Sequence, residues 1–176
     1  MIRYMFPGTT YAEWITKPGL PYADTIFPGI WKFYFYALSS VVEKPGGGGR
    51  RGSYVAPHIR IEVSRRDSTG RYESDTTLIW YATSKDLYYA YNFATKSSVP
   101  CTLLKDDTLT NELSIDTVWI KVPVGFPMKR TDRLYIKVFL DTRSYGWTGW
   151  EQYSYIYYNS TESPNAPSWL ELPPAP

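Results

Sequence analysis

The sequence contains a single cysteine, Cys101, and a single histidine, His58, among its 176 residues. One cysteine cannot form an intrachain disulfide or a zinc site built on cysteines. Because the chain has only one histidine and one cysteine, a Cys–His or Ser–His nucleophile pair is improbable. We therefore expect Cys101 to be a small buried apolar residue and His58 to be structural, and we expect no cofactor.

Long apolar runs and a strong excess of charge are also missing. No stretch is long and apolar enough to span a bilayer, and residues 1–8 lack the continuous apolar run of a signal peptide. The formal net charge is only +2, whereas binding of nucleic acid as a main task usually shows as a strongly basic face. These absences predict a soluble protein made in the cytoplasm, with no transmembrane segment and no specific nucleic-acid partner.

Motifs of catalysis and metal binding are scarce. A Gly-x-Ser-x-Gly elbow is absent. The 17 acidic residues lie mostly in turns or alternate with Lys and Arg, which is typical of a solvated surface. A glycosidase needs two carboxylates across a cleft, so a hydrolase stays only as the least favoured alternative. Asp106 and Asp107 resemble a calcium ligand pair, but the alternating Asp/Asn loop with its central Gly is missing. We expect neither an enzyme nor a metal site.

Aromatic and alternating apolar residues are abundant instead. The 17 Tyr, 7 Trp and 7 Phe favour strands, while 14 Pro and 12 Gly disfavour long helices. In residues 133–141 the apolar side chains recur at every second position, which places them on one face of a strand, toward a core. Thr131-Asp132 supplies a turn just before it. We expect this stretch to be a central strand, with Leu134, Ile136, Val138 and Leu140 inward.

Other extended segments are predicted at 30–38, 57–64, 77–82, 87–94, 99–104, 117–123 and 153–158. About eight short strands with turn signals between them predict an all-β, antiparallel β-sandwich. The long connections after Leu38 and Leu104 favour a single jelly roll over a meander. The strand at 30–38 is apolar on both faces, which indicates a central position with its outer side covered. Pro100 places the strand at 99–104 at a sheet edge or a bulge.

We expect an N-terminal arm at 1–28, one sandwich domain at 29–160 and a Pro-rich C-terminal tail at 161–176. The arms either lie over the sandwich or reach a neighbouring subunit. The Gly-rich loop at 43–52 lacks the Gly-Lys-Ser/Thr ending and the helix of a P-loop, so we interpret it as a flexible basic loop. Its candidate contact residues are Arg50 and Arg51, and the candidate assembly anchors in the arms are Trp14, Trp169, Leu170 and Leu172.

An aromatic, Gly-hinged loop follows residue 141. Exposed aromatic rings stack on sugars or fill partner pockets. In small β proteins such rings also cover the open end of a core. Both interpretations apply to the candidate contact residues Tyr145, Trp147, Trp150 and Tyr153.

Two stretches carry a resemblance to a family. Residues 27–35 place a Gly before an aromatic-rich strand, as Gly29-Ile30-Trp31-Lys32-Phe33, and residues 131–139 read Thr-Asp-Arg-Leu-Tyr-Ile-Lys-Val-Phe. Over residues 27–158 the chain resembles jelly-roll virion proteins of bacterial and archaeal viruses, in which such strands open the sandwich and lie near its end.

The resemblance implies a virion structural protein, either capsid or capsid-associated, that is made in the host cytoplasm and self-assembles through aromatic surfaces and terminal arms. Its partners would be copies of itself and other virion proteins. The few Asn and Gln residues (Asn92, Asn111, Asn159, Asn165 and Gln152) hint at a thermophilic host. The main alternative is a carbohydrate- or receptor-binding module of a viral spike or tail that uses the aromatic loop.

Overall fold

A computed structural model describes residues 2–4, 11–19, 21, 24–43, 58–82, 87–107, 112–141, 150–157 and 168–176. In these segments the regular structure is entirely β, and none of them holds a helix that could cross a membrane. The strands are β1 (Ile2–Tyr4), β2 (Tyr11–Ile15), β3 (Thr25–Ile26), β4 (Gly29–Glu43), β5 (His58–Arg66), β6 (Tyr72–Ala82), β7 (Leu87–Asn92), β8 (Ser97–Pro100), β9 (Thr102–Asp106), β10 (Ser114–Val122), β11 (Phe126–Pro127), β12 (Arg133–Asp141), β13 (Trp150–Tyr157) and β14 (Trp169–Glu171).

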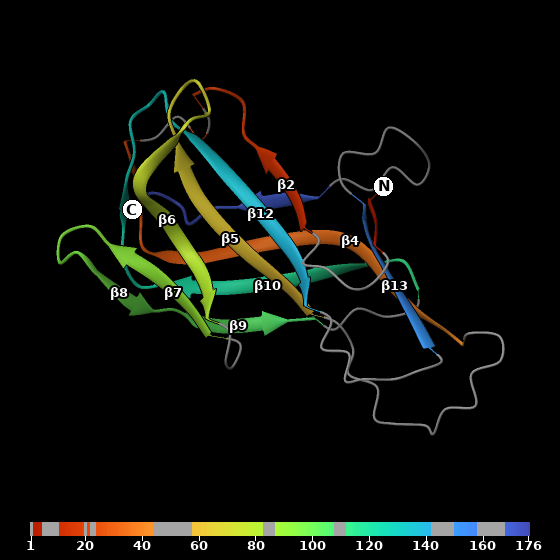
Figure 1. Ribbon diagram of the computed structural model, residues 1–176. Helices are drawn as coiled ribbons and strands as arrows, with labels where there is room; N and C mark the ends of the chain where they lie inside the picture. Colours follow the sequence, from red (N-terminus) through yellow and green to blue (C-terminus); the bar gives the residue numbers. More distant parts are fainter. Residues whose placement is uncertain are drawn as a thin grey trace.

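The strands form two six-stranded antiparallel sheets. Sheet A has the order β1-β13-β4-β10-β9, with β14 also paired to β4, and sheet B has the order β2-β12-β5-β6-β7-β8. A two-stranded ribbon of β3 and β11 accompanies them. In Figure 1 the strands β12, β5 and β6 of sheet B lie across β4 and β10 of sheet A. The predicted all-β, antiparallel architecture is confirmed, and β12 is an interior strand of its sheet, between β2 and β5.

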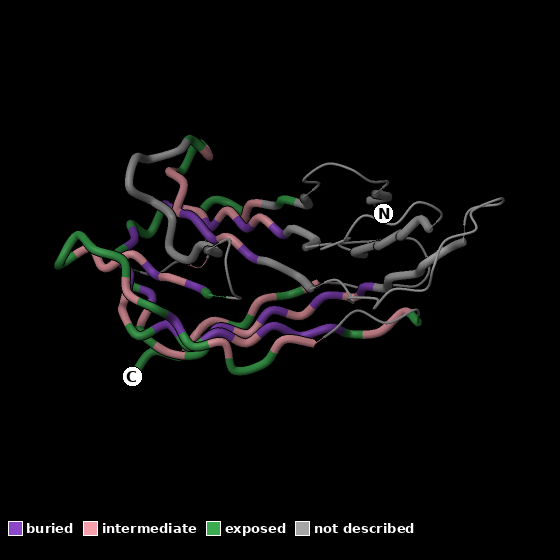
Figure 2. The backbone as a smooth tube through the Cα atoms, turned by 60° about the horizontal axis from the view of Figure 1, so that its bottom comes forward, coloured by how far each residue is buried: buried purple, intermediate pink, exposed green. Residues whose placement is uncertain are grey.

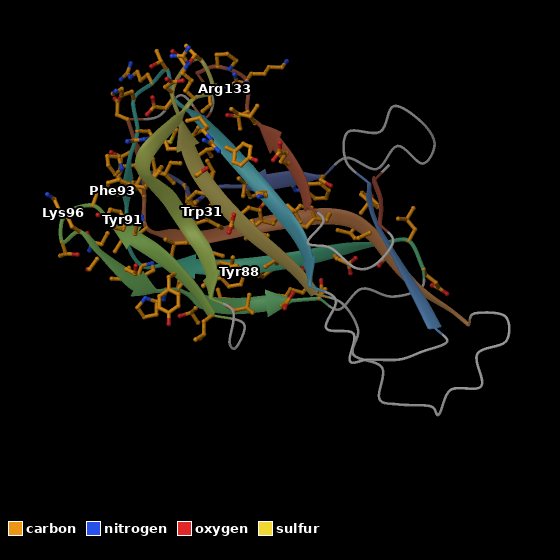
Figure 3. The ribbon with its side chains drawn as sticks, viewed as in Figure 1. Trp31, Tyr88, Tyr91, Phe93, Lys96 and Arg133 are labelled. Atoms are coloured by element: carbon orange, nitrogen blue, oxygen red, sulfur yellow. The ribbon has the colours of Figure 1, made fainter. Side chains whose placement is uncertain are left out.

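The core lies between the two sheets. Along β4 the alternate residues Trp31, Phe33 and Phe35 are buried, and along β12 Leu134, Ile136 and Val138 are buried. Figure 2 shows this alternation of buried and partly exposed residues along both layers. Trp31 from sheet A and Tyr88 from sheet B lie between the layers (Figure 3). Period-two alternation therefore identified the inward face of β12 at Leu134, Ile136 and Val138, while the side chain of Leu140 is not described. For β4, whose two faces are both apolar, alternation left the inward face open.

The strand predicted at 99–104 is two strands in different sheets. β8 ends at Pro100 as the edge of sheet B, and β9 begins at Thr102 as the edge of sheet A. The chain crosses between the sheets at Cys101, which is buried and whose backbone N–H donates to the Tyr88 carbonyl at 2.7 Å. The edge position of Pro100 is as predicted, because proline cannot donate to a further strand.

The two terminal segments pair with the chain's own sheets. β1 pairs with β13 at the edge of sheet A, and β2 pairs with β12 at the edge of sheet B. The end of β2 is fixed by Thr16, whose N–H donates to the Leu134 carbonyl at 2.9 Å and whose own carbonyl accepts from Arg133 Nε at 2.6 Å. The N-terminal residues at 2–4 and 11–15 thus complete both sheets.

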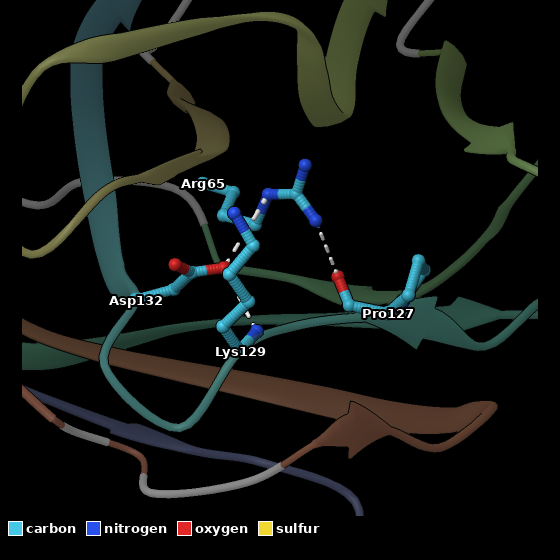
Figure 4. A network of polar contacts seen from close by, with 4 residues as sticks. All are labelled: Arg65, Pro127, Lys129 and Asp132. Atoms are coloured by element: carbon cyan, nitrogen blue, oxygen red, sulfur yellow. Dashed lines mark hydrogen bonds and ion pairs between the residues drawn. The ribbon is translucent and has the colours of Figure 1, made fainter.

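A polar network holds the turn that leads into β12 (Figure 4). Asp132, which is 1% exposed, accepts the Lys129 backbone N–H at 2.9 Å and lies 3.6 Å from Arg65 Nε. Arg65 also donates to the Pro127 carbonyl at 2.9 Å. Its guanidinium lies within 5.9 Å of the Phe126 ring centroid. The network ties β5 to β11 and to the start of β12, so the turn signal at Thr131-Asp132 is confirmed.

We predict that Asp132→Ala destabilises the protein by about 3 kcal/mol, because removing one partner leaves the half-buried Arg65 charge without its carboxylate and the turn without its cap. Chemical denaturation measures this free energy of unfolding. Thr131→Ala is the matched control, since Thr131 is exposed and should change it by less than about 0.5 kcal/mol. Equal effects of the two substitutions would contradict the role of the network.

We predict that the Cys101 thiol does not react in the native protein. Burial raises its pKa to about 12, and the thiolate, not the thiol, is the nucleophile. A colorimetric disulfide reagent at pH 8 should modify Cys101 only after unfolding in denaturant, and rapid stoichiometric reaction of the native protein would refute the prediction.

Candidate interaction surface

The predicted aromatic contact loop falls largely outside the described residues. Tyr145 and Trp147 are not among them. Trp150 and Tyr153 are positions of β13, in register with Glu43 and Ser40 of β4, but their side chains are not described. Arg50 and Arg51 also lie outside the described segments. Contact roles for these residues therefore stay predictions.

The predicted assembly anchors of the tail dock on the chain's own sheet A. The Trp169 ring stacks on Tyr34 with their centroids 4.5 Å apart. Leu170, in register with Phe33, and Leu172 both pack against the core. The fourth anchor, Trp14, sits in β2 opposite Ile136, and its side chain is not described. Of the two alternatives for the tail, the structure shows the one in which it lies over the sandwich.

The side of sheet A that faces away from sheet B, called the outer face below, carries exposed apolar side chains. It is formed by the outward positions of β14, β4, β10 and β9. Among the large apolar side chains that are exposed in the described segments, all but Leu87 belong to these four strands. They are Ile30, 39% exposed, Leu104, 47%, Ile115, 43%, and Trp169, 39%. Ile30, Ile115 and Trp169 take outward register positions, with charged and aromatic residues between them, and Leu104 lies at the register shift of β9.

A row of charged and aromatic residues crosses the outer face. Glu171 is in register with Lys32, Lys32 with Trp119, and Trp119 with Lys105, one residue from each of the four strands. The Lys32 ammonium lies 3.1 Å from the Glu171 carboxylate and 5.3 Å from the Trp119 ring centroid, and the Lys105 ammonium lies 5.5 Å from that centroid. The hydrogen bond with Glu171 raises the pKa of Lys32, and the same bond lowers the pKa of Glu171. Both therefore stay charged over the physiological range.

A second row lies beside the first. Trp169 is in register with Tyr34, and Tyr34 with Thr117. The Thr117 N–H and hydroxyl both donate to Asp107, at 3.0 and 2.6 Å, and the Lys105 ammonium lies 3.1 Å from the same oxygen. Burial alone would raise the pKa of Asp107, but the hydrogen bonds from Thr117 and Lys105 outweigh burial, so its pKa lies below the usual value. Asp107 thus holds Lys105 in place at the edge of the face.

Behind this edge a carboxyl group points into the sandwich. Asp116 of β10 is 3% exposed and is in register with the buried Phe35. Its Oδ2 is buried and accepts no hydrogen bond from the described part of the chain. Burial, then the charges of Asp107 and Asp106, raise the pKa of Asp116 to about 7, although Lys105 acts in the opposite direction. No group of three metal-binding side chains occurs among the described residues, which include all three aspartates.

Sequence reasoning missed Asp116. In the segment predicted at 117–123, Val118, Ile120 and Val122 alternate on one face, and the same period extended backward by one step reaches Asp116. That extension would have placed a carboxylate inside the core. Trp119, Lys32 and Lys105 were also not singled out, because cross-strand neighbours are set by strand pairing and not by spacing in the sequence.

Comparison with protein-family models, with curated proteins and with solved structures finds no match for this chain. The geometry of the outer face therefore carries the functional argument. It combines exposed apolar side chains with two rows of charges that neutralise one another, an arrangement suited to holding another protein surface.

We predict that the stability advantage of Asp116→Asn over the wild type grows with pH. A carboxyl whose folded pKa is raised binds its proton more tightly when folded. The wild type therefore loses stability as pH rises from about 4, the unfolded pKa, to about 7, by at most about 1.4 kcal/mol per pH unit. The neutral amide lacks this loss.

Chemical denaturation of both proteins at pH 4.5, 6 and 7.5 measures the difference. Asp107→Asn is the control, because a group with a lowered pKa contributes stability above the unfolded pKa and loses it on acidification, so this variant should be less stable than the wild type at neutral pH. A constant difference between wild type and Asp116→Asn would show that Asp116 does not titrate in this range.

Proposed function

We propose that the protein is a structural subunit that assembles with copies of itself, of the kind that builds virus particles. The supporting observation is the outer face of sheet A, where Ile30, Leu104, Ile115 and Trp169 are exposed on neighbouring strands. Leaving the exposed part of such side chains in water is costly. Since more than half of each one is already covered, burying the rest contributes roughly 0.6–1.4 kcal/mol. Association with another protein surface removes that cost.

The strand pairing supports a virion-type sandwich derived from a jelly roll. In a rolled-up hairpin the first strand pairs with the last and the second with the next to last. Here β4 pairs with β13 in sheet A and β5 pairs with β12 in sheet B. Between these outer pairs, β5, β6, β7 and β8 follow one another as neighbours in one sheet. We propose that the fold is related to a jelly roll: it has the two outer strand pairs of a jelly roll, β4 with β13 and β5 with β12, but its middle strands β6, β7 and β8 form a meander.

Self-association is favoured over sugar binding on this face. A sugar ring needs an open aromatic face to stack on. The Trp119 ring has lysines over it from both flanking strands, and Trp169 already stacks on Tyr34. The host-recognition alternative rests on the aromatic loop that includes Tyr145 and Trp147.

The test is the mass of the purified full chain as a function of concentration, by light scattering and sedimentation velocity, together with electron microscopy of the largest species. We expect association that grows with concentration and ordered assemblies at high concentration. Ile115→Ser should weaken association at least about tenfold, because each copy loses a buried apolar side chain.

Leu87→Ser is the matched control. Leu87 is exposed to 40%, close to the 43% of Ile115, but belongs to β7 in sheet B. It should leave association unchanged. A chain that stays monomeric at every concentration would refute the proposed function.

A further inference from the structure

The first row of the outer face is complementary to itself when it is read backward. From β14 to β9 it runs Glu171, Lys32, Trp119, Lys105, which is acid, cation, ring, cation. When the same row of a second copy is laid over it in reverse order, Glu171 lies opposite Lys105 and Lys32 lies opposite Trp119. Each of these two contacts occurs twice, once from each copy.

We infer that the outer face of sheet A binds the same face of a second copy about a two-fold axis that runs parallel to the strands, between β4 and β10. This inference rests on the proposed self-assembly and adds its surface and symmetry. In this arrangement Glu171 of one copy faces Lys105 of the second copy. Lys32 lies opposite Trp119 of the second copy, a ring that the lysines of its own chain already flank, so the charge complementarity of the row rests on Glu171 and Lys105.

The second row agrees with the same axis. When it is reversed, Trp169 lies opposite Asp107 of the second copy, and Tyr34 lies opposite the strand position of Thr117 of the second copy. Thr117 is buried and its hydroxyl already donates to Asp107, so the contact in this row comes from Trp169 and the partly exposed Asp107. Further along β4 and β10, the partly exposed Tyr36 faces the exposed Ile115 of the second copy.

Charge disfavours a two-fold axis that lies in the plane of the face along the first row. Such an axis, perpendicular to the strands, would lay each residue over its own copy. Glu171 would then face Glu171 of the second copy, and both lysines would face lysines. Such like-charge contacts across an interface cost several kcal/mol.

The size of the face suits a weak contact between copies. β4 and β10 pair over nine residues, but β9 has five residues and β14 has three. At about 4.8 Å between strands and about 3.4 Å per residue, these strands cover about 420 Å² on each copy and about 850 Å² in total, in the range of weak contacts. Two acids, Glu171 and Asp107, and three lysines, Lys32, Lys105 and Lys121, leave the face far from strongly basic, which favours a copy of the same chain over a polyanion.

A charge swap tests the arrangement. Sedimentation equilibrium of the full chain gives the dimer Kd for the wild type, for Lys105→Glu, for Glu171→Lys and for the double variant. Each single substitution places like charges opposite one another twice and should raise Kd at least about tenfold. The double variant restores opposite charges between copies and should bind more tightly than either single variant, although it loses the ion pairs with Lys32 and Asp107 within each chain.

The rescue can only act between copies. Within one chain, β14 and β9 lie three strand spacings apart, about 14 Å, so the two residues do not meet. Lys17→Glu is the matched control, since Lys17 is exposed beyond the end of β2 and should leave Kd unchanged. Circular dichroism melts establish that every variant is folded.

The outcomes separate this inference from the proposed function. Loss in both single variants with rescue in the double supports the inference. A wild type that associates while the single variants do so equally well, or a double variant that is not rescued, overturns the two-fold contact and leaves self-assembly through another surface. A monomeric wild type, including one that instead binds an oligosaccharide or a single-stranded oligonucleotide, overturns both.

Discussion

The structure depends on β4, because its inward residues form the core and its outward residues form part of the outer face of sheet A. Its inward residues Trp31, Phe33 and Phe35 lie in a line, with neighbouring ring centroids 6.3 and 6.4 Å apart, and form the centre of the core. One edge of the strand pairs with β10, and the other pairs with β13 and then β14. Because its outward residues are apolar and aromatic too, the strand that builds the core also sets the chemistry of the outer face.

Alternation predicted the strands that pack regularly and failed where the regularity is interrupted. It identified the inward face of β12. In β5, alternation after Val63 places Ser64 on the other face, where the strand pairing puts it opposite Tyr135, yet Ser64 is only 7% exposed. The pairing of β5 with β6 shifts register on both sides of Ser64. The sequence shows no comparable signal for the crossing at Cys101, because residues 97–106 are extended on both sides of it. The candidate site was less predictable than the fold, since its rows exist only once β14, β4, β10 and β9 are paired.

The C-terminal segment illustrates a contact that local pattern cannot reveal. It is rich in proline and has no period, so sequence reasoning found only apolar residues in need of a surface. The surface is β4: Trp169 stacks on Tyr34, and Pro173 lies against Gly29, where a Cβ would come within 2.6 Å of the proline ring. Gly29 is therefore required for close approach and not for a turn. This contact places Glu171 beside Lys32 and so completes the first row of the outer face.

The interior and the outer face are linked by electrostatic repulsion between two carboxylates, Asp116 inside the sandwich and Asp107 at the edge of the outer face. Asp107 and Asp116 interact electrostatically, and two nearby carboxylates cannot both ionise without cost. Asp107 is partly exposed and receives donors from Thr117 and Lys105, whereas Asp116 is buried and accepts no bond at Oδ2 within the described residues. The proton therefore goes to Asp116, and Asp107 keeps the charge that holds Lys105 on the outer face. β10 carries both ends of this link, with Asp116 directed inward and Thr117 outward. The charge on Asp107 that holds Lys105 at the edge of the outer face thus also favours the neutral form of Asp116 inside the sandwich.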